Sequence, residues 1–71
     1  MPDMITVSSS NVTSVGYEDS TQTLYVQFHS GTMYIYKGVP RYEYEGLLNA
    51  SSVGSYLHRN IKNIFPYERI S

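Results

Sequence analysis

A chain of 71 residues is long enough for one small domain, which we expect to span residues 1–71, because domains usually hold about 50 to 250 residues. The absence of cysteine excludes disulfides and thiolate zinc sites, and two histidines alone are too few to hold a structural metal. A net charge of −1 argues against a protein that grips a DNA duplex through its phosphates, since such proteins are basic overall.

Three segments with alternating residues come first along the chain and predict β-strands. They are residues 11–18, 22–29 and 32–37. Each is rich in Val, Tyr, Ile or Thr and is bounded by turn residues. Residues 4–8 form either a further short strand or the lead-in to the first one. A four-residue loop at 19–22 would place Tyr17 opposite Leu24, which joins the apolar faces of the first two strands.

The loop before the third strand decides which way Tyr34 and Tyr36 point. A two-residue loop at Ser30 and Gly31 would turn both tyrosines away from the core, but it requires a positive φ at the serine, which serine avoids. A three-residue loop with a left-handed Gly31 fits the residues better and places Tyr34 opposite Val26 on the core face. This difference of one residue reverses every side chain of the strand.

The face of the sheet turned away from the core then carries Tyr25, Met33 and Ile35. An exposed apolar patch of this kind usually marks association between proteins. A chain of this size also builds only a thin core, which oligomerisation commonly supplements. We therefore expect a homo-oligomer whose interface contains these three side chains.

Two helices are predicted after residue 37. Pro40 suits the first turn of a helix that continues with Tyr44 and Leu47. Ser51 or Ser52 can cap a second helix, which we expect to continue to Pro66. Its stripe consists of Val53, Tyr56, Leu57, Asn60, Ile61 and Ile64. The predicted fold class is α+β, a small antiparallel sheet of three to four strands followed by two helices packed on one face.

Three stretches of the chain are similar to the KTSC domain family. They are LYVQFHSGTMYIYKGVP, LLNASSVGSYL and IKNIFPY. Tyr34 and Tyr36 match the central Tyr-x-Tyr of the family, and Ser52-x-Gly54 followed by Tyr56 also fits. The resemblance extends from about Asn11 to Tyr67. It implies a domain like the one at the C-terminus of certain lysyl-tRNA synthetases, in a short free-standing bacterial or phage form, and it implies RNA binding.

No catalytic residue, metal site or cofactor is predicted. Glu43 and Glu45 lie on different sides of a helix, so they cannot share general acid–base work. His29 and His58 belong to no metal-binding pattern, and no serine stands in a nucleophile motif. We therefore do not expect an enzyme.

Tyrosines and one helix N-terminus supply the candidate ligand contacts. Tyr34 and Tyr36 are either core residues whose hydroxyls reach the rim or rings that contact a ligand, since tyrosine can stack on a nucleobase. The N-terminus of the second helix is either an ordinary serine cap or a site for a phosphate, with Gly54 admitting the ligand to the backbone. The predicted ligand-binding residues are Tyr34, Tyr36, Lys37, Ser51, Ser52, Gly54, Arg59 and Lys62.

These observations predict a small, non-catalytic, oligomeric binding module of the cytoplasm. The leading hypothesis is recognition of a nucleotide or a short RNA element, and one form of it is a phage-type sponge that sequesters a host nucleotide immune signal. The alternative is a protein–protein interaction module without a small ligand. No apolar run approaches the roughly 18 residues that a membrane span needs, so no membrane partner is expected.

Overall fold

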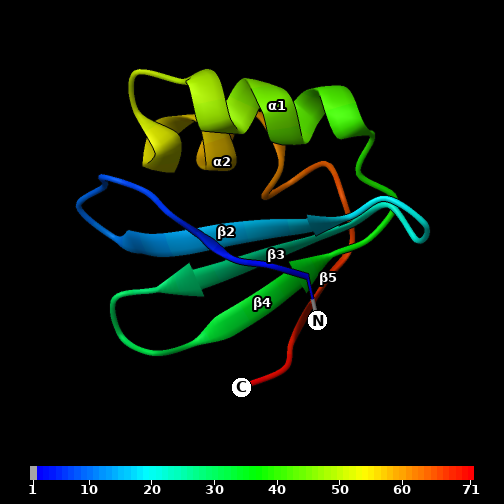
Figure 1. The fold of residues 1–71 in the computed structure, drawn as a ribbon, viewed down its shortest axis with the longest axis horizontal. Coiled ribbons are helices and arrows are strands. Elements are labelled where there is room, and N and C mark those ends of the chain that lie inside the picture. The colour runs from blue at the N-terminus through cyan, green and yellow to red at the C-terminus, as the bar shows by residue number, and fades with distance from the viewer. Residues whose placement is uncertain (1) are drawn as a thin grey trace.

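The computed structural model describes residues 2–71 and contains one antiparallel sheet and two helices. Its elements are β1 (Ile5–Thr6), β2 (Val12–Glu18), β3 (Thr23–Phe28), β4 (Met33–Tyr36), α1 (Arg41–Asn49), α2 (Val53–Asn60) and β5 (Tyr67–Arg69). The strands lie in the order β1-β2-β3-β4-β5, and both helices lie over one face of the sheet (Figure 1). The α+β class is therefore confirmed. Neither helix within residues 2–71 is long and apolar enough to cross a bilayer.

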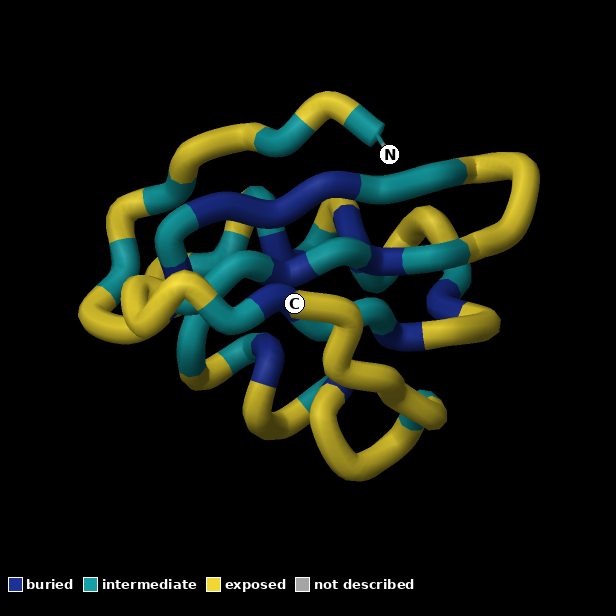
Figure 2. The backbone as a smooth tube through the Cα atoms, turned by 90° about the horizontal axis from the view of Figure 1, so that it is seen from below, coloured by how far each residue is buried: buried dark blue, intermediate teal, exposed yellow. Residues whose placement is uncertain are grey.

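The number of strands is five, so the prediction of three to four was wrong. β1 occupies part of the segment 4–8 that the sequence left open. β5 was missed altogether, because its three residues are all exposed and show no alternation. It is defined by its partner instead, since it pairs antiparallel with β4 after the chain returns from α2. Figure 2 shows this C-terminal segment exposed along its whole length.

The two predicted turns are confirmed by the pairing of the strands. Tyr17 lies opposite Leu24, as a four-residue loop at 19–22 requires. Val26 lies opposite Tyr34, as the three-residue loop requires, and Gly31 has a φ of +90°. The Gly31 N–H donates to the Phe28 carbonyl at 2.9 Å, which closes the turn. Tyr34 and Tyr36 therefore face the helices.

A single core fills the space between the sheet and the helices. Tyr36 is 2% exposed and is the largest side chain that is almost completely buried. The other buried members of the core cluster are Val12, Val15, Leu24, Val26, Val39, Tyr44, Leu47, Val53, Leu57 and Ile61. The strands contribute every second residue and the helices every third or fourth, as predicted, except at Val12. Val12 lies three residues before Val15, because an irregularity between Val12 and Ser14 shifts the pairing of β2 with β3.

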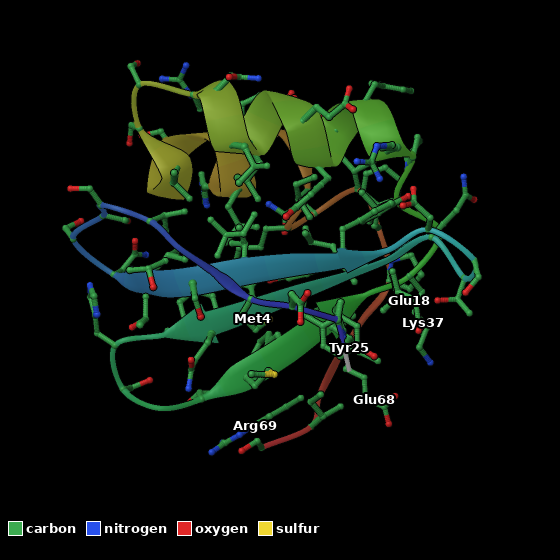
Figure 3. The ribbon with its side chains drawn as sticks, in the orientation of Figure 1. Met4, Glu18, Tyr25, Lys37, Glu68 and Arg69 are labelled. Atoms are coloured by element: carbon green, nitrogen blue, oxygen red, sulfur yellow. The ribbon has the colours of Figure 1, made fainter. Side chains whose placement is uncertain are left out.

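The outer face of the sheet is more covered than the sequence suggested. Met33 was predicted to be exposed, yet it is only 7% exposed within a single chain. The N–H of Ile70 donates to the Met33 carbonyl at 2.9 Å. At the other terminus, Met4 lies over Gly16 so closely that a Cβ on the glycine would be 2.7 Å from the Met4 sulfur (Figure 3). Both terminal segments therefore pack onto the sheet. No local residue pattern in these segments predicted this.

The second helix is shorter than predicted, because α2 ends at Asn60 and does not continue to Pro66. Ile61 is buried, but Ile64 lies outside the helical stripe and is 62% exposed. The Lys62 N–H donates to the Leu57 carbonyl, five residues earlier, at 2.8 Å, which closes the end of the helix in a wider turn. The chain then turns back to the sheet, where the Lys37 N–H donates to the Pro66 carbonyl at 2.9 Å.

Candidate aromatic ligand pocket

A cavity of about 500 Å³ lies beside α2, along the part of the sheet formed by β3, β4 and β5. Side chains and backbone from four regions line it: the loop before β2, the β3–β4 hairpin, α2 with the turn after it, and β5. The lining residues are Asn11, Phe28, Ser30, Thr32, Tyr34, Tyr36, Gly54, Leu57, His58, Lys62 and Tyr67. The size lies within the range of about 300–1,000 Å³ that small-molecule sites usually have.

Four aromatic rings form one wall of the cavity. Tyr34 and Tyr67 are stacked, with ring centroids 5.5 Å apart and an angle of 3° between the planes. Phe28 meets Tyr34 at 80° with a centroid distance of 5.7 Å. Tyr36 lies 5.9 Å from Tyr67 and 6.5 Å from Tyr34. The cluster exists because β5 places Tyr67 directly opposite Tyr36 on the same face of the sheet.

The two tyrosines of the central motif have different roles in this wall. Tyr36 is a core residue, and burial raises the pKa of its hydroxyl, with smaller contributions from Tyr34 and Tyr67. It is therefore neutral at ordinary pH and can donate a hydrogen bond. Tyr34 is only half-buried and leaves more of its surface at the cavity. The sequence left open whether the two tyrosines are core residues or ligand contacts. The structure makes Tyr36 a core residue, whereas Tyr34 remains partly accessible at the cavity.

The polar end of the cavity is formed where the loop before β2 approaches the first turn of α2. A Cβ on Gly54 would lie 2.8 Å from Oδ1 of Asn11, so only glycine permits this approach without a shift. The Ser9 hydroxyl donates to the same Oδ1 at 3.1 Å. Ser30 and Thr32 complete this end from the β3–β4 hairpin. Gly54 was predicted to let a ligand approach the helix backbone closely, but in the structure Asn11 of the same chain lies there.

Positive charge enters the cavity from the helix side. His58 and Lys62 are exposed and are four residues apart, which places them on one side of α2 and of the turn after it. The salt bridges found within residues 2–71 use Lys37 and Arg41, not Lys62. Lys62 therefore keeps its ammonium available for an anion in the cavity.

The predicted ligand residues divide into two groups. Tyr34, Tyr36, Gly54 and Lys62 come together in this cavity. Three others, Ser51, Ser52 and Arg59, line a separate hollow of about 260 Å³. There Ser52 caps α2, accepting a hydrogen bond from the Ser55 N–H at 3.3 Å. Lys37 lies away from both and forms an exposed ion pair with Glu68 at 3.4 Å (Figure 3).

Sequence reasoning missed seven of the residues that line the cavity: Asn11, Phe28, Ser30, Thr32, Leu57, His58 and Tyr67. Phe28 could have been found, because it continues the inward face of its strand in step with Val26. His58 could also have been found from its spacing of four residues on either side to Gly54 and Lys62. Tyr67 gives no local signal, since it lies in the exposed strand that was not predicted.

A hydrogen bond between the helices fixes the position of α2, and therefore one wall of the cavity. The Tyr56 hydroxyl donates to Oε1 of Glu43 on α1 at 2.6 Å. This hydrogen bond, with smaller contributions from burial and nearby charges, raises the pKa of Tyr56 to about 12. Gly46 makes the contact possible, because a Cβ at that position would collide with the Tyr56 ring.

The protein should lose stability at high pH through this contact. The folded state holds the Tyr56 proton more tightly than the unfolded chain, whose tyrosines titrate near pH 10. The contribution is fully present below about pH 10 and is lost as the pH rises through about 12. Tyr56→Phe should therefore show a smaller fall in the free energy of unfolding between about pH 8 and 11.5, measured by urea denaturation. A fall as large as in the parent protein would contradict this.

Neither a metal-binding cluster nor His29 contributes to the cavity within the described residues. Within residues 2–71, no group of three or more His, Asp or Glu side chains is placed to hold a metal ion. His29 lies outside the cavity, with one ring nitrogen 2.7 Å from the Thr13 hydroxyl and the other 2.8 Å from the Ser9 carbonyl. What the cavity offers is a set of rings, hydroxyls and one ammonium group, which can hold a planar anion.

Comparisons with known proteins agree on one family. The KTSC domain model matches residues 8–65. A lysine–tRNA ligase from Trichormus variabilis is 49% identical over 55 residues, 78% of this chain and 10% of the ligase, so the chain spans about a tenth of that relative. An uncharacterised protein from Stutzerimonas stutzeri is 36% identical over 58 residues, 82% of each chain. The crystal structure of a KTSC domain protein from Yersinia pestis superposes with a TM-score of 0.95 at 31% identity, covering 100% of both chains.

Proposed function

The chain belongs to the KTSC domain family, and we propose that it is a non-catalytic binding module that recognises a nucleotide, free or as part of a short RNA element. The observation that carries this proposal is a single cavity that is lined both by an aromatic wall and by Lys62. Aromatic side chains bind bases through stacking, and a lysine adds the charge that a phosphate needs.

The dimensions and charge of the cavity favour a short ligand over an extended nucleic acid. Its volume suits a small molecule or one unit of a chain. Lys62 and His58 are the basic side chains that line it, and the whole protein carries a net charge of −1. An extended duplex would require many more phosphate contacts than this.

Two forms of the proposal differ in the source of the nucleotide. In the first, the module binds RNA, which is supported by the similarity to part of proteins named lysine–tRNA ligase. In the second, the module acts in the cytoplasm as a sponge that removes a nucleotide signal by binding it, as a phage protein would against host defence. Both forms use the same cavity, and neither requires a bond to be made or broken.

Self-association through the outer face is part of the proposal. Tyr25 and Ile35 remain half-buried there, and Ile70, whose N–H donates to the Met33 carbonyl, is among the exposed large apolar residues. Since Met33 is covered by its own chain, the interface would rest on these other side chains. The same exposed residues favour the second candidate function, a protein–protein interaction module, and binding of a different protein chain by this face would support it.

The test compares two basic residues, Lys62 in the cavity and Arg59 in the separate hollow. Thermal melting of the parent protein is measured with a panel of mononucleotides and with short single-stranded RNA, since a bound ligand raises the melting temperature by mass action. Lys62→Ala should weaken binding of the ligand found by about tenfold, the effect of one charged hydrogen bond. Arg59→Ala removes the same charge from the separate hollow and should bind as the parent does.

The results separate the candidates. A steep fall of affinity with salt would favour the RNA form, because several phosphates then release counterions. A shift in melting temperature with a mononucleotide favours the sponge form. If neither ligand shifts the melting temperature, nucleotide recognition is wrong and the interaction module is favoured.

A further inference from the structure

Other side chains of the same chain already pack against the tyrosines of the central Tyr-x-Tyr motif. Tyr67 lies parallel to Tyr34 at 5.5 Å, and Phe28 meets Tyr34 at a steep angle from another side. Tyr36 is buried in the core. A planar ligand could stack on Tyr34 from the side of β5 only by displacing Tyr67. Neither tyrosine of the motif therefore supplies an open platform on that side.

Tyr67 itself presents such a platform. Tyr67 is 58% exposed although one face of its ring packs against Tyr34. Much of its surface therefore remains accessible to a ligand. Tyr67 also lines the same cavity as Lys62 and His58, so a ring placed on it lies within the reach of positive charge.

The backbone holds this platform in place before any ligand arrives. Tyr67 is paired with Tyr36 across β4 and β5, and Pro66 just before it accepts the Lys37 N–H at 2.9 Å. On the outer side of the sheet, the ion pair of Lys37 with Glu68 joins the same two strands. A ring that is fixed in this way loses little conformational entropy when a ligand stacks on it.

We infer that Tyr67 is the residue on which the planar ring of the ligand stacks, so that the ligand becomes the third ring of a stack that begins with Tyr34 and Tyr67. The anionic group of the ligand then points toward Lys62. This inference rests on the proposed nucleotide recognition and assigns its specificity to β5, outside the residues 8–65 that the family model matches.

The chain offers a direct optical test, because it contains no tryptophan. Tyr67→Trp places a single indole at the platform, and a base that stacks on it should quench its fluorescence. AMP and UMP supply a base with a phosphate, whereas ribose 5-phosphate supplies the phosphate without a base. We expect quenching by the nucleotides and none by ribose 5-phosphate at equal concentration.

Tyr42→Trp is the matched control. Tyr42 lies on α1, is 70% exposed and does not line the cavity. Its fluorescence should remain unchanged in the same titrations. Equal quenching of both tryptophans would show that the nucleotides act by collision in solution, and it would overturn the inference.

Binding measured by calorimetry distinguishes this inference from the proposed function. Tyr67→Ala should weaken AMP binding by about tenfold or more, because the substitution removes the ring on which the base stacks. Tyr67→Phe keeps the ring and should bind as the parent does. If Lys62→Ala weakens binding while Tyr67→Ala does not, the proposed function stands and the platform is elsewhere. If the parent protein binds no nucleotide, both the proposed function and the stacking role of Tyr67 are wrong.

Discussion

Replacing Tyr36 with alanine is expected to lower the free energy of unfolding by about 3–5 kcal/mol, the usual cost of truncating a buried aromatic side chain to alanine. The side chain is 2% exposed and belongs to the core cluster. A domain of this length has a total stability of about 4–11 kcal/mol, so Tyr36→Ala removes much of it. Urea denaturation followed by circular dichroism measures the change.

Tyr34→Ala is the informative comparison, because it changes the other tyrosine of the same motif. Its side chain is only half-buried, so the loss of stability should be smaller than for Tyr36→Ala. Equal losses for the two variants would show that both tyrosines are core residues and would contradict the division of roles described above.

Replacing Met33 with aspartate should destabilise the single chain by about 3 kcal/mol or more. The substitution removes a buried apolar side chain and places an unpaired carboxylate where the side chain is only 7% exposed. The expected result is a chain that unfolds in much less urea than the parent protein needs. A variant that is as stable as the parent would show that Met33 is accessible after all.

Ile35→Asp is the matched control on the same strand and separates folding from association. Its cross-strand partner is Tyr25 on the outer face, and both are half-buried. If this face joins two copies of the chain, Ile35→Asp should leave the fold intact and shift the mass measured by light scattering to that of a monomer. An assembly of unchanged mass would argue against this interface.

Much of the fold follows from local residues, and the hairpin at Gly31 shows why. Serine disfavours the backbone angles of the shorter loop, and glycine accepts those of the longer one, so turn chemistry alone chooses the pairing of Val26 with Tyr34. That choice also fixes which side chains of the neighbouring strands face the helices. The start of the second helix follows from serine in the same way, because Ser52 caps it.

What could not be predicted depends on contacts between distant parts of the chain. β5 has three exposed residues and becomes a strand only because β4 offers an unpaired edge. The coverage of Met33 and Gly16 likewise depends on terminal segments without a periodic pattern of their own. The site shows the same limit, because Tyr34 and Lys62 were predicted, whereas Tyr67 depends on β5 and was not.

The order of the strands also determines the stage of folding at which the cavity forms. β1 to β4 follow one another through short connections, so their pairing closes only small loops. β5 reaches β4 only after both helices have intervened, and closing that longer span costs more chain entropy. Such non-local pairing slows folding. The hairpins can therefore form before β5 pairs with β4, and the cavity has its complete aromatic wall only once Tyr67 is in place.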